Sequence, residues 1–232
     1  MGRLTDHPGP GAFDAVQAHA YAAAMDIETE FPHDQVFLEL LRHHTRGAVL
    51  DLGGGTGRYA AWLLTMHLAT SAHVIDNSPA MIDACTQRRV PGLTVQLGDI
   101  ATADLGREQY ETVLARFVLM HVRALAETLH HIAMSLTETG TLVVVTNIVA
   151  GTPAAVATFV EETAGIMQLL LQVKGPPIAV ANYVHTQDDY IQAFQQAGLR
   201  MAFCEQYAPQ LLRFAQAHPG ITLAHVVLLG KK

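Results

Sequence analysis

The chain has 232 residues, half of them hydrophobic and only 15% charged, with a formal net charge of −7. Its length suits a single domain with a full core, and its acidic balance disfavours a nucleic-acid partner, because phosphate binding needs clustered Lys and Arg. No apolar run is long enough to span a membrane. The N-terminal segment lacks an apolar signal core, so we expect a cytoplasmic protein without a membrane partner. Cys85 and Cys204 have no metal-binding spacing, which fits a reducing compartment and a site without metal.

Two helices are predicted before the first strand. Residues 13–25 are alanine-rich and favour a helix, and residues 33–46 carry apolar side chains at helical spacing. From residue 48 the chain alternates between strands and helices, which predicts a parallel sheet with helices on both faces. The strands are predicted over 48–52, 71–75, 93–97, 110–116 and 141–146, and the helices over 59–68, 80–88 and 124–136.

Beyond the fifth strand this alternation stops. A strongly apolar helix, interrupted near Gly165, is predicted over 154–173. Thr186 and Asp189 have the spacing of a capping box and predict the start of the next helix. The last two strands are expected over 200–207 and 221–229.

The stretch Val49–Arg58 is the most informative part of the chain. An apolar strand ends in Asp51, and a glycine-dense turn and a helix follow. Glycine allows positive φ and close approach of a ligand, and the start of a helix offers unpaired N–H groups, so the stretch predicts a nucleotide-cradling site. No Lys follows the glycines, which excludes a P-loop, and the dinucleotide pattern fails because its third glycine would fall at Arg58. A glycine-rich turn without a ligand is the simpler alternative.

The pattern Asp-x-Gly-x-Gly-x-Gly from Asp51 to Gly57 resembles motif I of the class I S-adenosylmethionine-dependent methyltransferases. An acid at this place suits a ligand with an ammonium group, a sulfonium and no phosphate, because a pyrophosphate would be repelled. The resemblance covers residues 46–148 with ordered motifs and 182–230 more loosely.

That resemblance implies one α/β domain over 1–232. Its fold would be Rossmann-like, with a seven-stranded, mostly parallel sheet, an antiparallel last strand and helices on both faces. The implied parts are a helical N-terminal cover (1–46), a cofactor-binding core (47–148), a helical insertion or lid after strand five (149–181) and the C-terminal part of the sheet (182–232).

The resemblance also implies which residues bind S-adenosylmethionine, with S-adenosylhomocysteine as the product. Asp76, at the end of the second strand, matches the acid that accepts hydrogen bonds from the ribose hydroxyls. Met81 is placed to lie against the adenine, and Asp99 and Ile100 match the positions that recognise the adenine edge. Ser78 is expected to cap the helix that follows it. The implied cofactor set is Asp51, Gly53, Gly55, Asp76, Asn77, Met81, Asp99, Ile100 and Arg116.

The acceptor side is less determined. His121 lies in the segment that faces the acceptor in this family, and its imidazole could take a proton from a hydroxyl or an ammonium acceptor. A His that only packs locally is the alternative. Arg116 could instead hold an acidic group of the substrate or pair with an acid of the fold. The candidate substrate contacts, each with a structural role as its alternative, are His19, Tyr21, Tyr183 and His185.

The function implied is transfer of a methyl group to an oxygen, nitrogen or carbon atom of a small molecule, with catalysis coming mainly from positioning. The apolar insertion favours a largely apolar metabolite or natural-product intermediate as acceptor, or else a homodimer contact. Because a fold does not fix a function, a cyclase or isomerase that binds the cofactor without transferring its methyl group stays open. A binding protein with a degenerate site is a third alternative, against which the intact motif I argues.

Overall fold

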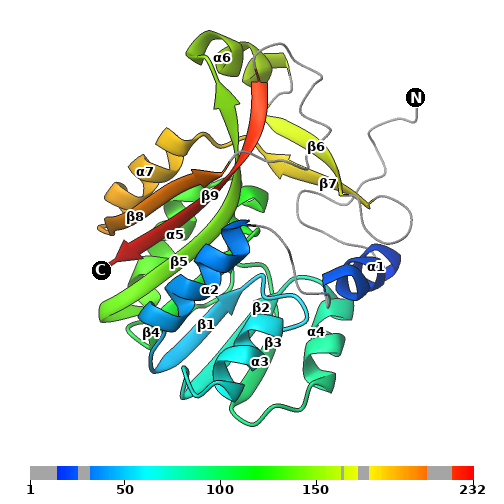
Figure 1. The fold of residues 1–232 in the computed structure, drawn as a ribbon, viewed down its shortest axis with the longest axis vertical. Helices are drawn as coiled ribbons and strands as arrows, with labels where there is room; N and C mark the ends of the chain where they lie inside the picture. The colour runs from blue at the N-terminus through cyan, green and yellow to red at the C-terminus, as the bar shows by residue number, and fades with distance from the viewer. Residues whose placement is uncertain (1–14, 26–31, 163–164, 172–177, 208–220) are drawn as a thin grey trace.

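A computed structural model describes residues 15–25, 32–162, 165–171, 178–207 and 221–232. Its centre is a seven-stranded sheet of order β3-β2-β1-β4-β5-β9-β8 (Figure 1). Neighbouring strands are parallel except β9, which is antiparallel to both β5 and β8. The predicted Rossmann-like sheet with an antiparallel last strand is therefore confirmed. The strands are β1 Ala48–Leu52, β2 Ser71–Asp76, β3 Leu93–Leu97, β4 Tyr110–Arg116, β5 Leu136–Gly151, β8 Arg200–Tyr207 and β9 Ile221–Lys231.

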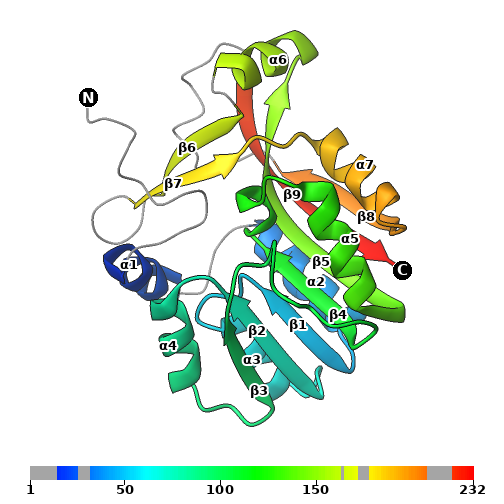
Figure 2. The same cartoon turned by 180° about the vertical axis from the view of Figure 1, so that it is seen from behind.

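Helices pack on both faces of this sheet because the side chains of each strand alternate between two cores. Leu50 and Leu52 of β1 belong to the core under α5 and α7, whereas Val49 belongs to the core under α2 and α3. Figure 2 shows the face covered by α5 and α7. The helices are α2 Pro32–His44, α3 Arg58–Thr65, α4 Pro79–Gln87, α5 Leu125–Ser135 and α7 Gln187–Gln196. None of them, nor any other helix in the described ranges, combines the length and apolarity that crossing a bilayer requires.

The segment after β5 differs from the prediction. Helix α6, Pro153–Glu162, is followed by a two-stranded antiparallel hairpin of β6, Ile166–Leu171, and β7, Ile178–Tyr183. The predicted helix over 154–173 is therefore wrong in its second half. Gly165 has φ 74°, which no helix accommodates, and a short apolar run such as that of β6 has no periodicity that separates a buried helix from a strand.

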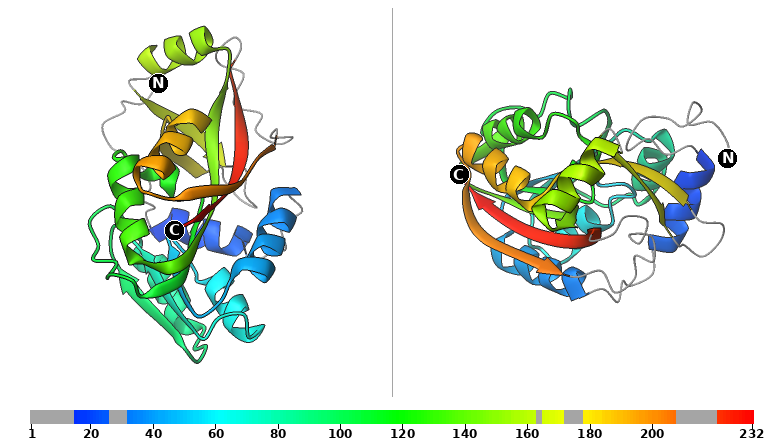
Figure 3. Two further views of the ribbon diagram at one scale, coloured as in Figure 1. Left: turned by 90° about the vertical axis from the view of Figure 1, so that its left-hand side faces the viewer. Right: turned by 90° about the horizontal axis from the view of Figure 1, so that it is seen from above.

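Two elements lie beyond the carboxyl ends of the parallel strands. The β6–β7 hairpin extends from the region of β5 toward the side of the molecule where α1, Ala15–Met25, packs beside α4 (Figures 1 and 3). The hairpin packs against η1, Leu119–His121, the 3-10 turn that follows β4. The hairpin and α1 are therefore placed to surround whatever binds at this edge of the sheet.

Candidate functional site

The glycine loop is fixed to the carboxyl ends of β1 and β2. Gly53, Gly55 and Gly57 have φ of 59°, 56° and 70°, the left-handed region that favours glycine. The Gly53 N–H donates to the Ile75 carbonyl at 2.7 Å. A Cβ on Gly53 would collide with the side chain of Val118, and a Cβ on Gly57 would collide with the Cys85 sulfur. The loop is therefore closely packed at Gly53 and Gly57, and these two positions have room only for glycine.

These contacts predict different costs for two alanine substitutions in one loop. Gly53→Ala and Gly55→Ala meet the same backbone penalty, because both residues have similar positive φ. A Cβ on Gly55 is 3.7 Å from the Met81 sulfur and fits, whereas one on Gly53 overlaps Val118. We expect Gly53→Ala to lower the free energy of unfolding by about 1–3 kcal/mol more than Gly55→Ala, as measured by urea denaturation. Equal losses in the free energy of unfolding would show that the Val118 side chain can move aside without a measurable penalty.

Asp76 holds the glycine loop through its carboxylate. It is only 9% exposed. Its Oδ2 accepts a hydrogen bond from the Gly55 N–H at 2.9 Å, and its Oδ1 accepts one from the Ser78 N–H at 2.9 Å. Burial raises the pKa of Asp76, and these two bonds oppose that rise. Each carboxylate oxygen retains a further lone pair, so a ribose hydroxyl remains compatible with this arrangement.

The cap predicted at Ser78 is wrong in one respect. Ser78 occupies the N-cap position of α4 with Pro79 in the first turn, but its hydroxyl makes no capping bond. The Ser78 Oγ is buried and has no partner within the described part of the chain. The N–H of Ser78 is bound to Asp76 instead, which fixes the start of α4 to the end of β2.

Asp51 is a buried acid beside the loop. It is 3% exposed, and its Oδ2 has no hydrogen-bond partner among the described residues. Burial, and then the charge of Asp76, raise the pKa of Asp51 to about 7, while the backbone N–H of Ala60 in the first turn of α3 opposes the rise. A carboxyl group in this position gains free energy from any cation that reaches it.

The other predicted cofactor residues lie around the ends of β2 and β3. Met81 is buried with its sulfur toward Gly55, and Ile100 is buried at the margin of the core under α5. Asn77 is exposed. Asp99 is also exposed, and its Oδ1 accepts from the Ala101 N–H at 2.9 Å, which makes a local turn. The structure thus brings Asp51, Asp76, Met81 and the glycines together, with Asp99 and Ile100 on the adjacent strand end.

Arg116, at the end of β4, lies in a cluster that the sequence did not indicate. Its guanidinium carbon is 5.2 Å from the centroid of the Tyr59 ring and 4.6 Å from that of Phe117. Arg58 lies 4.7 Å from the Tyr59 centroid and donates to the Tyr59 hydroxyl at 2.7 Å. Such cation–π contacts hold both arginines at the edge of the sheet. Arg58 and Tyr59 follow motif I directly, and that position was the only signal available.

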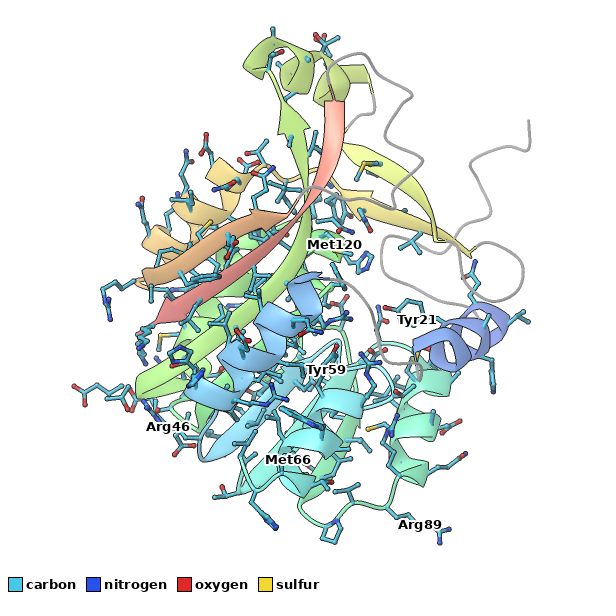
Figure 4. The ribbon with its side chains drawn as sticks, in the orientation of Figure 1. Tyr21, Arg46, Tyr59, Met66, Arg89 and Met120 are labelled. Carbon is cyan, nitrogen blue, oxygen red and sulfur yellow. The ribbon has the colours of Figure 1, made fainter. Side chains whose placement is uncertain are left out.

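Helix α1 adds Tyr21 to this cluster (Figure 4). Burial raises the pKa of Tyr21, and the charges of Arg116 and Arg58 oppose the rise, whereas Asp76 adds to it. These influences require Tyr21 to lie within electrostatic range of the site. His19, from the same helix, is exposed. Of the two candidates on the N-terminal cover, the structure therefore brings only Tyr21 to the edge of the sheet.

His121 lies at the end of η1 and is half-buried. Its Nδ1 is 3.2 Å from the Ala181 carbonyl of β7, which can only accept, so Nδ1 is the protonated nitrogen of the neutral ring and Nε2 carries the lone pair. Burial lowers the pKa of His121. The ring is therefore neutral at neutral pH and has one nitrogen able to accept a proton.

Tyr183 and His185 both make contacts with other parts of the protein. His185 Nε2 is 2.8 Å from the Val122 carbonyl, and its ring meets that of buried Tyr190 edge-on at 5.8 Å. The Tyr183 ring is 6.5 Å from that of His185. These contacts join the end of β7 to the segment after η1, and through it to α7.

The comparisons with known proteins agree with this geometry. Residues 49–140 match the family model of a methyltransferase domain. Among curated proteins, no sequence matches the chain. The three solved structures described next are 11–16% identical to the chain, so their likeness shows the fold alone.

Three of these structures have the fold in common and differ in activity. One is an S-adenosylmethionine-dependent methyltransferase from Mesorhizobium loti, 16% identical over 84% of this chain and 96% of that chain, with a TM-score of 0.61. Another is the phosphoethanolamine N-methyltransferase 2 of Haemonchus contortus in complex with phosphomonomethylethanolamine and S-adenosylhomocysteine, 14% identical over 94% of this chain and 57% of that chain, with a TM-score of 0.66. The third is the cyclase SpnF, 11% identical over 98% of this chain and 87% of that chain, with a TM-score of 0.64.

Proposed function

We propose that the protein is a class I S-adenosylmethionine-dependent methyltransferase and transfers a methyl group from S-adenosylmethionine to a small, largely apolar molecule, a proposal supported by the match of residues 49–140 to the model of a methyltransferase domain. Methyl transfer is proposed rather than cyclisation because only the resemblance of fold, and no residue of this site, points to a cyclase.

The buried Asp51 carboxyl carries the proposal. Its Oδ2 has no hydrogen-bond partner among the described residues, and its pKa stays raised although the charge of Arg116 opposes the rise, so the carboxyl group would be stabilised by a closer cation. The ammonium group of S-adenosylmethionine supplies that charge, whereas a nucleotide phosphate would be repelled by Asp51 and Asp76. The residues therefore fit this cofactor: Asp51 and the glycine loop would hold its amino-acid end, Asp76 its ribose, and Met81 its adenine. When bound, it supplies a methyl group on a positively charged sulfur.

The side chains beyond the carboxyl edge favour an apolar acceptor. Leu119 and Met120 of η1, Met167 of β6 and Val180 of β7 are all buried in this region. Together with a net charge of −7, they make a small apolar metabolite a better partner than a polyanion. Arg116 and Tyr59 would position the acceptor and exclude water at the margin of the cofactor site.

His121 would act as the base where the acceptor must lose a proton. Its Nδ1–H is held by the Ala181 carbonyl, which orients Nε2 as the proton acceptor. Because burial lowers the pKa of His121 below its ordinary value of 6.5, the rate should rise with pH only below that value and stay level above it.

Substitution of His121 by glutamine tests this role. Glutamine can still donate to the Ala181 carbonyl but cannot take up a proton. We expect kcat for methyl transfer to fall about 100-fold, with the Kd for S-adenosylhomocysteine within about twofold of the wild-type value. The acidic limb of the pH profile should also vanish. Unchanged turnover would return His121 to a purely structural role.

The proposed function as a whole is tested by binding and by labelling. Isothermal titration calorimetry should detect binding of S-adenosylmethionine and of S-adenosylhomocysteine. If neither ligand bound, the proposal would be wrong. Incubation with methyl-labelled cofactor and a panel of apolar alcohols, amines and activated carbon acids should move label into an organic-extractable product. Turnover of an acceptor without incorporation of label would favour the cyclase or isomerase alternative.

A further inference from the structure

One asparagine of the β6–β7 hairpin has no hydrogen-bond partner at either end of its side-chain amide. Asn182 is 1% exposed, and within the described ranges neither its Oδ1 nor its Nδ2 meets a partner. Buried amides are nearly always bonded, because removing an amide from water without a new partner is costly. The unpaired amide of Asn182 therefore indicates a partner that comes from outside the chain.

The surroundings of Asn182 are apolar. Side chains alternate along a strand, so Asn182 shares its face of β7 with buried Val180. Its cross-strand neighbour on β6 is buried Met167. A single amide on an otherwise apolar face provides direction and selectivity rather than general polarity.

Asn182 also adjoins the residue that orients the candidate base. The Ala181 carbonyl accepts from His121 Nδ1 at 3.2 Å, and η1, which carries His121, packs against β7. The turn begins just after Val118, whose side chain occupies the space above Gly53 of the glycine loop. Contacts therefore run without a gap from the proposed cofactor loop to the hairpin, which lies beyond the same edge of the sheet (Figure 3).

We propose that Asn182 recognises the acceptor, and that the acceptor presents a hydrogen-bond donor beside a hydrogen-bond acceptor, as a carboxamide, a lactam or a carboxylic acid does. An asparagine amide offers the complementary pair, N–H beside C=O. The identification of this ligand as the methyl acceptor rests on the proposed function. The pairing of Asn182 itself does not require the cofactor.

Access requires the hairpin to move, because Asn182 is closed off from solvent. Among the described elements the hairpin packs chiefly against η1. The unpaired amide raises the free energy of the closed, empty state, and a ligand that pairs with it removes that cost. A ligand that pairs with Asn182 therefore stabilises the closed position of the hairpin relative to the empty state.

A matched pair of probes tests the pairing without knowledge of the natural acceptor. 2-Piperidone is a lactam with N–H beside C=O, and in N-methyl-2-piperidone a methyl group replaces the donor hydrogen. Titrations followed by the side-chain amide resonance of Asn182 in ¹⁵N-labelled protein should show at least about fivefold tighter binding of 2-piperidone. Equal affinities for the two probes in the wild-type protein would overturn the proposal.

Two variants complete the experiment, with binding followed by ligand-observed NMR. Asn182→Leu keeps the size of the side chain and removes both hydrogen-bonding groups, so the preference for 2-piperidone should vanish and the Tm of the ligand-free protein should rise by a few degrees. Val180→Ala alters the same face without touching the amide and should keep the preference. A preference that survives Asn182→Leu, or a fall in Tm of several degrees in that variant, would contradict the assignment. S-adenosylhomocysteine titration is the separate readout of the proposed function, so a lactam preference without cofactor binding would overturn that function alone.

Discussion

Substitution of Asp76 by alanine should weaken binding of S-adenosylhomocysteine by about 100-fold or more. The Asp76 carboxylate accepts hydrogen bonds from the Gly55 and Ser78 N–H groups, and we expect it to take the ribose hydroxyls as well. Bonds to a charged acceptor contribute about 1.5–3 kcal/mol each, and each 1.4 kcal/mol is a factor of ten in Kd. The loss of two such bonds, with the glycine loop released, gives the expected magnitude, which isothermal titration calorimetry can measure.

A matched control is available on the helix that follows. Asp83 of α4 is exposed, so Asp83→Ala removes the same chemical group from the element that follows β2 without touching the loop. We expect its affinity to stay within about twofold of the wild-type value. If Asp76→Ala and Asp83→Ala bound the ligand equally well, Asp76 would have no part in the site.

The sheet could be predicted from the sequence because its signals are local. The predicted bounds of β3, β4 and β8 agree with the structure, and a continuous β-branched run identified the buried β5. Asp51 and Asp76 could be placed at one edge because carboxyl ends of parallel strands meet there. The alternation of strand and helix predicted a parallel sheet with helices on both faces, and the antiparallel last strand was implied by the family resemblance.

The parts that escaped prediction depend on tertiary contacts. The apolar run of β6 becomes a strand because β7 pairs with it, and no local period announces this pairing. Tyr59 of α3 meets Arg116 of β4 across the edge of the sheet, and Tyr21 comes near them only because α1 packs beyond that edge. The capping hydroxyl of Ser78 was misassigned because Asp76, two residues earlier, binds the backbone at that helix start instead.

The residues of the proposed acceptor site also depend on tertiary contacts that the sequence does not reveal. His121 was proposed from its place after β4, but its tautomer depends on the Ala181 carbonyl, sixty residues away in the chain. Nothing in the sequence distinguishes Asn182 from other strand asparagines. Its significance comes from burial without a partner, which is a property of the packed structure alone. Residues that select a substrate are therefore harder to predict than residues that hold a common cofactor.

Substitution of Asp51 by asparagine should stabilise the ligand-free protein and damage cofactor binding at the same time. Asn keeps an acceptor for the Ala60 N–H and removes the ionisable group. The pKa of Asp51 is about 7 in the folded protein against 3.8 for the free group, and one unit is worth about 1.4 kcal/mol. At pH 8 we expect the variant to be more stable by on the order of 3 kcal/mol, or roughly 5–10 °C in Tm, with S-adenosylhomocysteine bound about tenfold or more weakly.

The pH dependence separates this explanation from a simple repacking. Between about pH 4 and pH 7 the unfolded chain has lost the Asp51 proton while the folded protein still holds it, so the free energy of unfolding falls as pH rises through this window and is level above it. Asp51→Asn should lose the part of this slope that comes from Asp51 and keep the part that comes from Asp76, whose pKa is also raised by burial, whereas Asp83→Asn at the exposed site on α4 should keep the whole slope. Equal pH profiles for the wild type and Asp51→Asn would contradict the raised pKa.

A cation bound beside Asp51 lowers the pKa of that carboxyl group, so saturating S-adenosylhomocysteine should also flatten the pH dependence of the free energy of unfolding in the wild-type protein. Ionising the buried Asp51 carboxyl costs free energy in the empty site. A cationic ligand recovers that free energy when it binds, and a neutral or anionic ligand does not.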